Sequence, residues 1–123
     1  MHLSIEGEEK LFRIMSQLEF SEKQRPEALR LAFIKGLAET KGIPEKVSRK
    51  TRFEFPQSVI AKGEEVVIFK HLIIDKAGEP LDDKLIEDYM TRFIEEGLIL
   101  MSKEVEALSD LDNYMLYLVD KHG

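Results

Sequence analysis

Cysteine is absent from the 123 residues, and this absence excludes several kinds of chemistry. The chain has no means of forming a disulfide framework, a thiolate metal site or a cysteine nucleophile. A cysteine-free composition also suits a reducing compartment, so we expect a cytoplasmic protein.

Long hydrophobic runs are also missing. No apolar stretch approaches the roughly 20 residues that span a membrane, and Met1 to Glu6 lack the basic and apolar regions of a signal peptide. We therefore expect no membrane association. Repeats, glycine-serine linkers and low-complexity tracts are absent too, which predicts a single domain over residues 1–123. A domain of this size has little core to spare for a deep catalytic cavity.

Motifs of catalysis and metal binding are not found. The histidines at positions 2, 71 and 122 lack the paired spacing of a zinc site. Acidic neighbours such as Glu95 and Glu96 point to different sides of a helix and form no carboxylate dyad. The chain has no P-loop, dinucleotide fingerprint or calcium loop. We therefore predict a protein that is not an enzyme and has no metal and no cofactor.

Positive charge is concentrated in one third of the chain, although the formal net charge is −6. Residues 23–52 contain nine basic and three acidic side chains, a charge of +6, which leaves −12 for the remainder. An anionic partner would therefore dock on this segment. The basic residues are Lys23, Arg25, Arg30, Lys35, Lys41, Lys46, Arg49, Lys50 and Arg52.

Two interpretations of this segment stay open on composition alone. Lysine and arginine in a connecting segment can simply keep it soluble. The density at Lys46, Arg49, Lys50 and Arg52, four cations in seven residues, favours contacts with phosphate groups instead. Such contacts need flexible positive groups and do not imply sequence-specific base readout.

Apolar spacing predicts a short strand and two helices in the first third. Residues 2–5 alternate as in a strand, and Leu11, Met15 and Leu18 recur at helical spacing in a helix over roughly residues 7–19. A second helix is expected from Arg25-Pro26 to near Gly42, because proline is tolerated in a first helical turn. Its apolar residues surround most of the helix, which places it in the core or in a dimer interface.

The rest of the chain is predicted to be a loop followed by further helices. Residues 43–63 read as loop with extended pieces, and for residues 64–75 we favour a helix over a buried strand. An amphipathic helix starts after Asp82 and is expected to run to about Leu108. Ser109 with Asp112 resembles a capping box for one last helix. The expected fold is mainly α: a ribbon-helix-helix-like start and a C-terminal bundle of two to three helices.

Three sequence features together resemble the DndE family of bacterial DNA sulfur-modification proteins. The first is Arg30-Leu31-Ala32-Phe33 with Gly42-Ile43-Pro44, and the second is Phe53-Glu54-Phe55 leading to Gly63-Glu64. The third runs from Leu81-Asp82 through Phe93-Ile94-Glu95-Glu96-Gly97 to Leu108-Ser109-Asp110-Leu111. The resemblance covers roughly residues 28 to 111.

The resemblance implies a function in DNA phosphorothioation, in which sulfur replaces a non-bridging phosphate oxygen. Members of the family are regarded as small oligomers, tetrameric, that bind duplex DNA, nicked duplex in particular, through surface lysines. This implies a homo-oligomer that binds duplex DNA beside the other sulfur-modification proteins. By charge and region the expected DNA-binding residues are Lys23, Arg25, Arg30, Lys35, Lys46, Arg49, Lys50 and Arg52.

Two other functions remain as alternatives. The chain could be a protein-interaction adaptor of the same machinery, in which the acidic residues within 79–112 dock a basic partner. It could also be a ribbon-helix-helix transcriptional regulator, which would read an operator with a paired strand in the major groove.

Overall fold

The computed structural model describes residues 1–46 and 51–122, with side chains at all of these positions except 52 and 109–122. It confirms a mainly helical fold in which a short strand and two helices precede two more helices. The elements are β1 (His2–Ser4), α1 (Ile5–Gln17), the 3-10 turn η1 (Glu22–Gln24), α2 (Arg25–Glu39), β2 (Thr51–Glu54), the 3-10 turn η2 (Gln57–Val59), α3 (Glu64–Ala77) and α4 (Asp83–His122).

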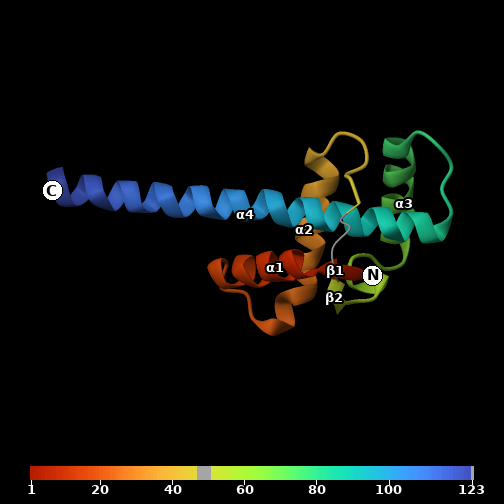
Figure 1. Cartoon of the computed structure of the whole chain (residues 1–123), viewed down its shortest axis with the longest axis horizontal. Coiled ribbons are helices and arrows are strands. Elements are labelled where there is room, and N and C mark those ends of the chain that lie inside the picture. Colours follow the sequence, from red (N-terminus) through yellow and green to blue (C-terminus); the bar gives the residue numbers. More distant parts are fainter. Residues whose placement is uncertain (47–50, 123) are drawn as a thin grey trace.

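Helix α4 is the axis around which the other elements are arranged (Figure 1). Helix α1 lies alongside it, α2 crosses it, and α3 lies near its N-terminal end (Figure 1). The two strands lie near the start of α1. The C-terminal part of α4 extends well past all the other elements (Figure 1).

Helix α1 begins two residues earlier than the expected Gly7, because Ser4 is its N-cap. The Ser4 hydroxyl accepts a hydrogen bond from the Gly7 backbone N–H at 2.9 Å, which satisfies one of the free donors of the first turn. Leu11, Ile14 and Met15 are buried on one side of this helix. The predicted helix is therefore confirmed, with its ends shifted toward the N-terminus.

Helix α2 starts at Arg25-Pro26 as expected but ends at Glu39 rather than near Gly42. Thr40, with φ −93° and ψ 129°, is already extended. The β-branched Thr40 has a low helix propensity, which favours this earlier end.

Small residues let α2 and α4 cross at very close range. A Cβ added to Gly36 would lie 2.0 Å from the Phe93 carbonyl oxygen, and one added to Gly97 would lie 1.7 Å from the Ala32 carbonyl oxygen. Because these neighbours are backbone atoms, no side-chain rearrangement could make room. The two glycines therefore determine how closely the two central helices approach.

The strands pair with each other inside the chain. Strand β1 is antiparallel to β2, with Leu3 opposite Phe53 and His2 opposite Glu54. The pairing continues at Met1, whose ammonium donates to the Phe55 carbonyl at 2.8 Å and whose carbonyl accepts from the Phe55 N–H at 2.9 Å. The extended pieces expected within residues 43–63 are confirmed by β2.

Residues 64–75 form a helix, α3, as favoured from the sequence. The expectation of a break at Ser109 is wrong, because α4 continues from Asp83 to His122. Between Gly97 and Gly123 the sequence has no glycine or proline. A serine inside a helix costs only a fraction of a kcal/mol relative to alanine, so the capping pattern alone does not end the helix.

One cluster of apolar side chains forms the core of the described residues. Phe33 of α2 lies at its centre and makes edge-on contacts with Phe69 of α3 at 5.0 Å and with Phe93 of α4 at 6.4 Å between ring centres. The core holds the strands and the N-terminal half of α4 together. The largest fully buried members are Leu3, Leu11, Ile14, Leu29, Phe33, Ile60, Ile73, Met90, Phe93, Ile94 and Leu98.

Candidate nucleic-acid interface

Arg30, one of the predicted DNA-binding residues inside α2, is engaged within the fold. Its guanidinium donates to the Ile60 carbonyl at 3.1 Å, forms an ion pair with Glu65 and lies 5.8 Å from the centre of the Phe69 ring. The hydrogen bond with Glu65 raises the pKa of Arg30 and lowers that of Glu65. Arg30 therefore connects α2 to the start of α3, and its charge is already balanced.

Lys35, on the same helix, is also paired with carboxylates. Its ammonium forms ion pairs with Glu104 of α4 and with Glu39, the latter at 3.1 Å. The hydrogen bonds with Glu104 and then Glu39 raise the pKa of Lys35. Like Arg30, this residue holds α2 against a neighbouring helix.

Arg25 lies between two aromatic rings. Its guanidinium carbon is 5.2 Å from the centre of the Phe12 ring and 5.4 Å from that of Phe53, which are cation–π distances. Glu22 lies at 4.0 Å. Arg25 thus joins α1, α2 and β2, and its side chain is only 30% exposed.

The five remaining predicted residues fall into two groups, those with a described side chain and those without one. Lys23 and Lys46 are exposed, and within the described residues neither forms an ion pair. Arg49 and Lys50 lie outside the described residues, and the side chain of Arg52 lies outside them too.

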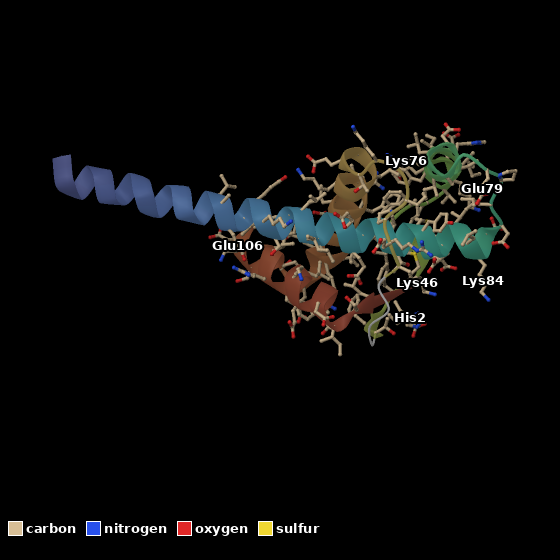
Figure 2. All side chains as sticks on the ribbon, turned by 45° about the horizontal axis from the view of Figure 1, so that its top comes forward. His2, Lys46, Lys76, Glu79, Lys84 and Glu106 are labelled. Carbon is tan, nitrogen blue, oxygen red and sulfur yellow. The ribbon has the colours of Figure 1, made fainter. Side chains whose placement is uncertain are left out.

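A cavity of about 470 Å³ opens beside Lys46. Its walls come from β1, β2 and the first turns of α4, elements that are far apart in the sequence. Figure 2 shows His2, Lys46 and Lys84 on one side of the N-terminal half of α4. The lining residues are Met1, His2, Ser4, Lys46, Thr51, Lys84, Glu87, Asp88, Thr91, Arg92 and Glu95.

The carboxylates of this cavity have partners within the chain. Asp88 accepts from Arg92 at 2.7 Å, and Glu87 lies 3.8 Å from the N-terminal ammonium. The buried Glu95 accepts from the backbone N–H of Ser4 at 2.7 Å and from its hydroxyl at 2.9 Å. Asp88 and Glu87 are thus paired with cations, and the carboxylate of Glu95 is stabilised by neutral hydrogen-bond donors.

Two cations at the cavity remain available to an outside partner. Lys46 and Lys84 are exposed, and neither has an ion pair among the described side chains. An anion at the cavity would lie near both ammonium groups and the hydroxyl of Thr51, whereas the Thr91 hydroxyl already donates to the Glu87 carbonyl at 3.1 Å. Groups of this kind bind phosphate oxygens in DNA complexes.

Sequence reasoning identified Lys46 but missed Lys84 and Arg92. Both belong to the acidic remainder of the chain, where charge counting gives no reason to select them. Only the packing of β1 and β2 against α4 brings them beside Lys46. No local sequence signal could have found this juxtaposition.

Among the side chains that the structure describes, no group of three or more histidines, aspartates and glutamates is arranged to hold a metal ion. None of the helices in the described part of the chain is long and apolar enough to cross a membrane.

Comparisons with protein-family models, curated proteins and solved structures find no match to this chain.

Proposed function

We propose that the protein is a non-catalytic DNA-binding subunit of a bacterial DNA sulfur-modification machinery, and that it holds duplex DNA, nicked duplex in particular, for partner enzymes. The observation that carries the proposal is the pair of exposed cations, Lys46 and Lys84, beside the cavity at the start of α4. Lys46 also begins the densest basic stretch of the sequence, residues 46–52. The sequence resemblance supplies the process in which the DNA is bound.

Balanced charges elsewhere strengthen the case for this location. Arg30 and Lys35 are paired with glutamates, and Arg25 is stacked on two rings. These three residues therefore contribute less to the binding of an outside anion. Unpaired lysines gain more from a phosphate because they lose no partner on binding. The DNA backbone therefore docks on the strand side of α4.

A charge-reversal experiment tests this location. Lys46→Glu combined with Lys84→Glu should abolish binding to a nicked duplex at low salt, measured by fluorescence anisotropy. The matched control is Lys62→Glu combined with Lys103→Glu, which reverses two exposed lysines that do not line the cavity and changes the net charge equally. Binding by the double variant equal to that of the control would remove this site.

A second charge-reversal variant tests the basic stretch itself. Reversing Lys46, Arg49, Lys50 and Arg52 to glutamate together should likewise abolish salt-sensitive binding to nicked or intact duplex. Unchanged binding by this quadruple variant would exclude the stretch as the DNA-binding segment.

The adaptor alternative is less well supported by the structure. Five acids of residues 79–112 are paired with cations of the same chain: Asp83, Glu87, Asp88, Glu104 and Glu106. A pull-down with the partner enzymes, repeated after nuclease treatment, separates the two functions. Complexes that survive the nuclease would favour the adaptor.

A ribbon-helix-helix regulator receives no support from the strand pairing. Strand β1 is paired with β2 of the same chain, whereas a regulator that reads DNA with a ribbon needs a paired strand presented to the major groove.

A further inference from the structure

The C-terminal part of α4 continues as a single helix past the other described elements (Figure 1). Helix α4 has 40 residues and is therefore about 60 Å long. Among the described side chains, its ion pairs furthest along the chain are Glu104 with Lys35 and Glu106 with Arg13. Beyond them, α4 runs away from the other elements (Figure 1). We call residues 107–122 the α4 tail.

The sequence of the α4 tail is too apolar for a helix surrounded by water. Residues 114–119 read Tyr-Met-Leu-Tyr-Leu-Val, six apolar or aromatic residues in succession. Leu108, the last apolar position with a described side chain, is 61% exposed. Residues 114–119 are apolar on every side of the helix, a pattern that is normally buried, and an isolated helix of this length is marginal in water. An apolar partner would therefore stabilise the α4 tail.

A second uncovered apolar surface lies on α2 and α3. These helices run side by side in the same direction, as shown by the contacts of Arg30 with Glu65, Phe33 with Phe69, and the Lys76 ammonium with the Thr40 carbonyl at 2.7 Å. Four large aliphatic residues on them are exposed. They are Leu31 at 44%, Ile34 at 39%, Ile68 at 55% and Leu72 at 43%.

Helix geometry places these four residues on one continuous face. At 100° per residue, Leu31 and Ile34 lie opposite the buried side of α2 that packs on α4. Ile68 lies about 140° and Leu72 about 100° around α3 from the buried Ile73, and both lie next to the side of α3 that contacts α2. The resulting surface, here the α2–α3 face, is turned away from α4.

The α4 tail and the α2–α3 face are similar in length, and neither is covered by the chain to which it belongs. The tail has 16 residues and is about 24 Å long, while α2 with 15 residues is about 22 Å long. The tail cannot cover the face of its own chain, because its end lies at the opposite end of the molecule from α3 (Figure 1). A second copy of the chain can provide an apolar partner for each of the two surfaces.

We infer that the α4 tail of one copy docks on the α2–α3 face of a second copy. In a two-fold assembly the same contact is made twice, once by each tail. A tail paired only with another tail would leave the α2–α3 face in water, whereas the proposed contact covers both surfaces at once. This inference is independent of the DNA-binding proposal.

Introduced cysteines test the contact directly, because the chain has none of its own. Two single variants are mixed under mild oxidation: Ile68→Cys in one copy and, in the other, Leu111→Cys, Met115→Cys or Leu118→Cys in turn. The three tail positions allow for the narrow distance range of a disulfide. We expect a covalent dimer linking position 68 to at least one of them, identified by mass spectrometry of the digest.

The control replaces Ile68→Cys with Glu79→Cys, an exposed position between α3 and α4. Links from position 68 no more frequent than those from position 79 would overturn the proposal. Links only between two tails would overturn it as well, and would assign the tail to another tail.

A second measurement uses mass in solution and does not depend on disulfide geometry. Ile68→Glu with Leu72→Glu should convert the assembly to monomers in light scattering after size exclusion, with unchanged helical content by circular dichroism. The matched control is Val67→Glu with Leu18→Glu. These residues are exposed at 55% and 43%, as Ile68 and Leu72 are, but Val67 lies on the side of α3 opposite α2 and Leu18 follows α1. A monomeric native chain, or equal masses for both variants, would contradict the inference.

Discussion

Arg30 and Glu65 show how a residue selected by its charge can serve the fold. The guanidinium stabilises the ionised carboxylate across α2 and α3, and the pKa of Glu65 falls below its ordinary value of 4.5. Since Glu65 is ionised more readily in the folded protein, the pair stabilises the fold at neutral pH. That contribution is lost as the pH falls through the lowered pKa.

A pH series of unfolding experiments measures this contribution. Glu65→Gln should lower the free energy of unfolding at pH 7, and the difference from the native chain should shrink toward pH 3. The effect is modest, because both side chains are partly exposed. A difference that stays constant or grows on acidification would contradict the role given to Glu65.

Glu95 has a larger structural role than its place in an acidic stretch suggests. It receives two hydrogen bonds from Ser4, the residue that caps α1, and lies so close to Gly7 that an added Cβ would be 2.6 Å from its Oε2. A carboxylate beside the start of a helix is also favoured by the helix dipole. Glu95 therefore fixes the start of α1 against α4.

Removing the charge of Glu95 should destabilise the protein. Glu95→Gln replaces one accepting oxygen with an amide group that cannot accept from Ser4, at a cost of about 1–3 kcal/mol. Urea unfolding measures the loss, with Glu96→Gln as the neighbouring control. Equal stability of the two variants would show that the Ser4 contact contributes nothing.

At the level of elements, the crossing of α2 and α4 depends on two glycines. Glycine inside a helix usually costs about 1 kcal/mol relative to alanine, so Gly36→Ala and Gly97→Ala would ordinarily stabilise. Here each added methyl group would collide with a backbone carbonyl. We expect losses of several kcal/mol, since overpacking that forces backbone shifts costs about 1–3 kcal/mol or more.

Thermal or urea unfolding distinguishes these outcomes by sign. The control is Ala38→Gly on the exposed side of α2, which should cost only about 1 kcal/mol. A rise in stability for Gly36→Ala or Gly97→Ala would show that the helices do not approach as closely as described.

Apolar spacing predicted the existence and type of the helices but not all of their ends. Periodicity and Pro26 located α1 and α2, and the favoured helix at residues 64–75 is α3. The break at Ser109 was wrong, because a capping pattern can also occur inside a helix. The close crossing at Gly36 and Gly97 carries no local signal, since it is a relation between residues far apart in the chain.

The candidate site was predictable to a smaller extent. Charge counting identified the exposed Lys46, together with Arg25, Arg30 and Lys35, which the fold employs in internal contacts. It missed Lys84, because that lysine lies among acidic residues in the sequence. A pattern of charges records where cations are, and only the tertiary structure shows which of them are balanced.

Over the whole molecule, a formal charge of −6 opposes the approach of DNA, so binding must rest on a few local contacts. Such contacts release counterions, and the logarithm of the binding constant falls with that of the salt concentration by about 0.9 for each phosphate neutralised. Two lysines at one cavity should therefore account for a measurable part of the salt dependence.

The most direct test is the salt dependence of binding to a nicked duplex, measured by fluorescence anisotropy for the native chain and for Lys46→Ala combined with Lys84→Ala. We predict that the double variant binds more weakly and that its slope is smaller by about 2, or about 1 for each lysine. Lys103→Ala should leave affinity and slope unchanged. Identical affinities and slopes for the native chain and the double variant would contradict the account.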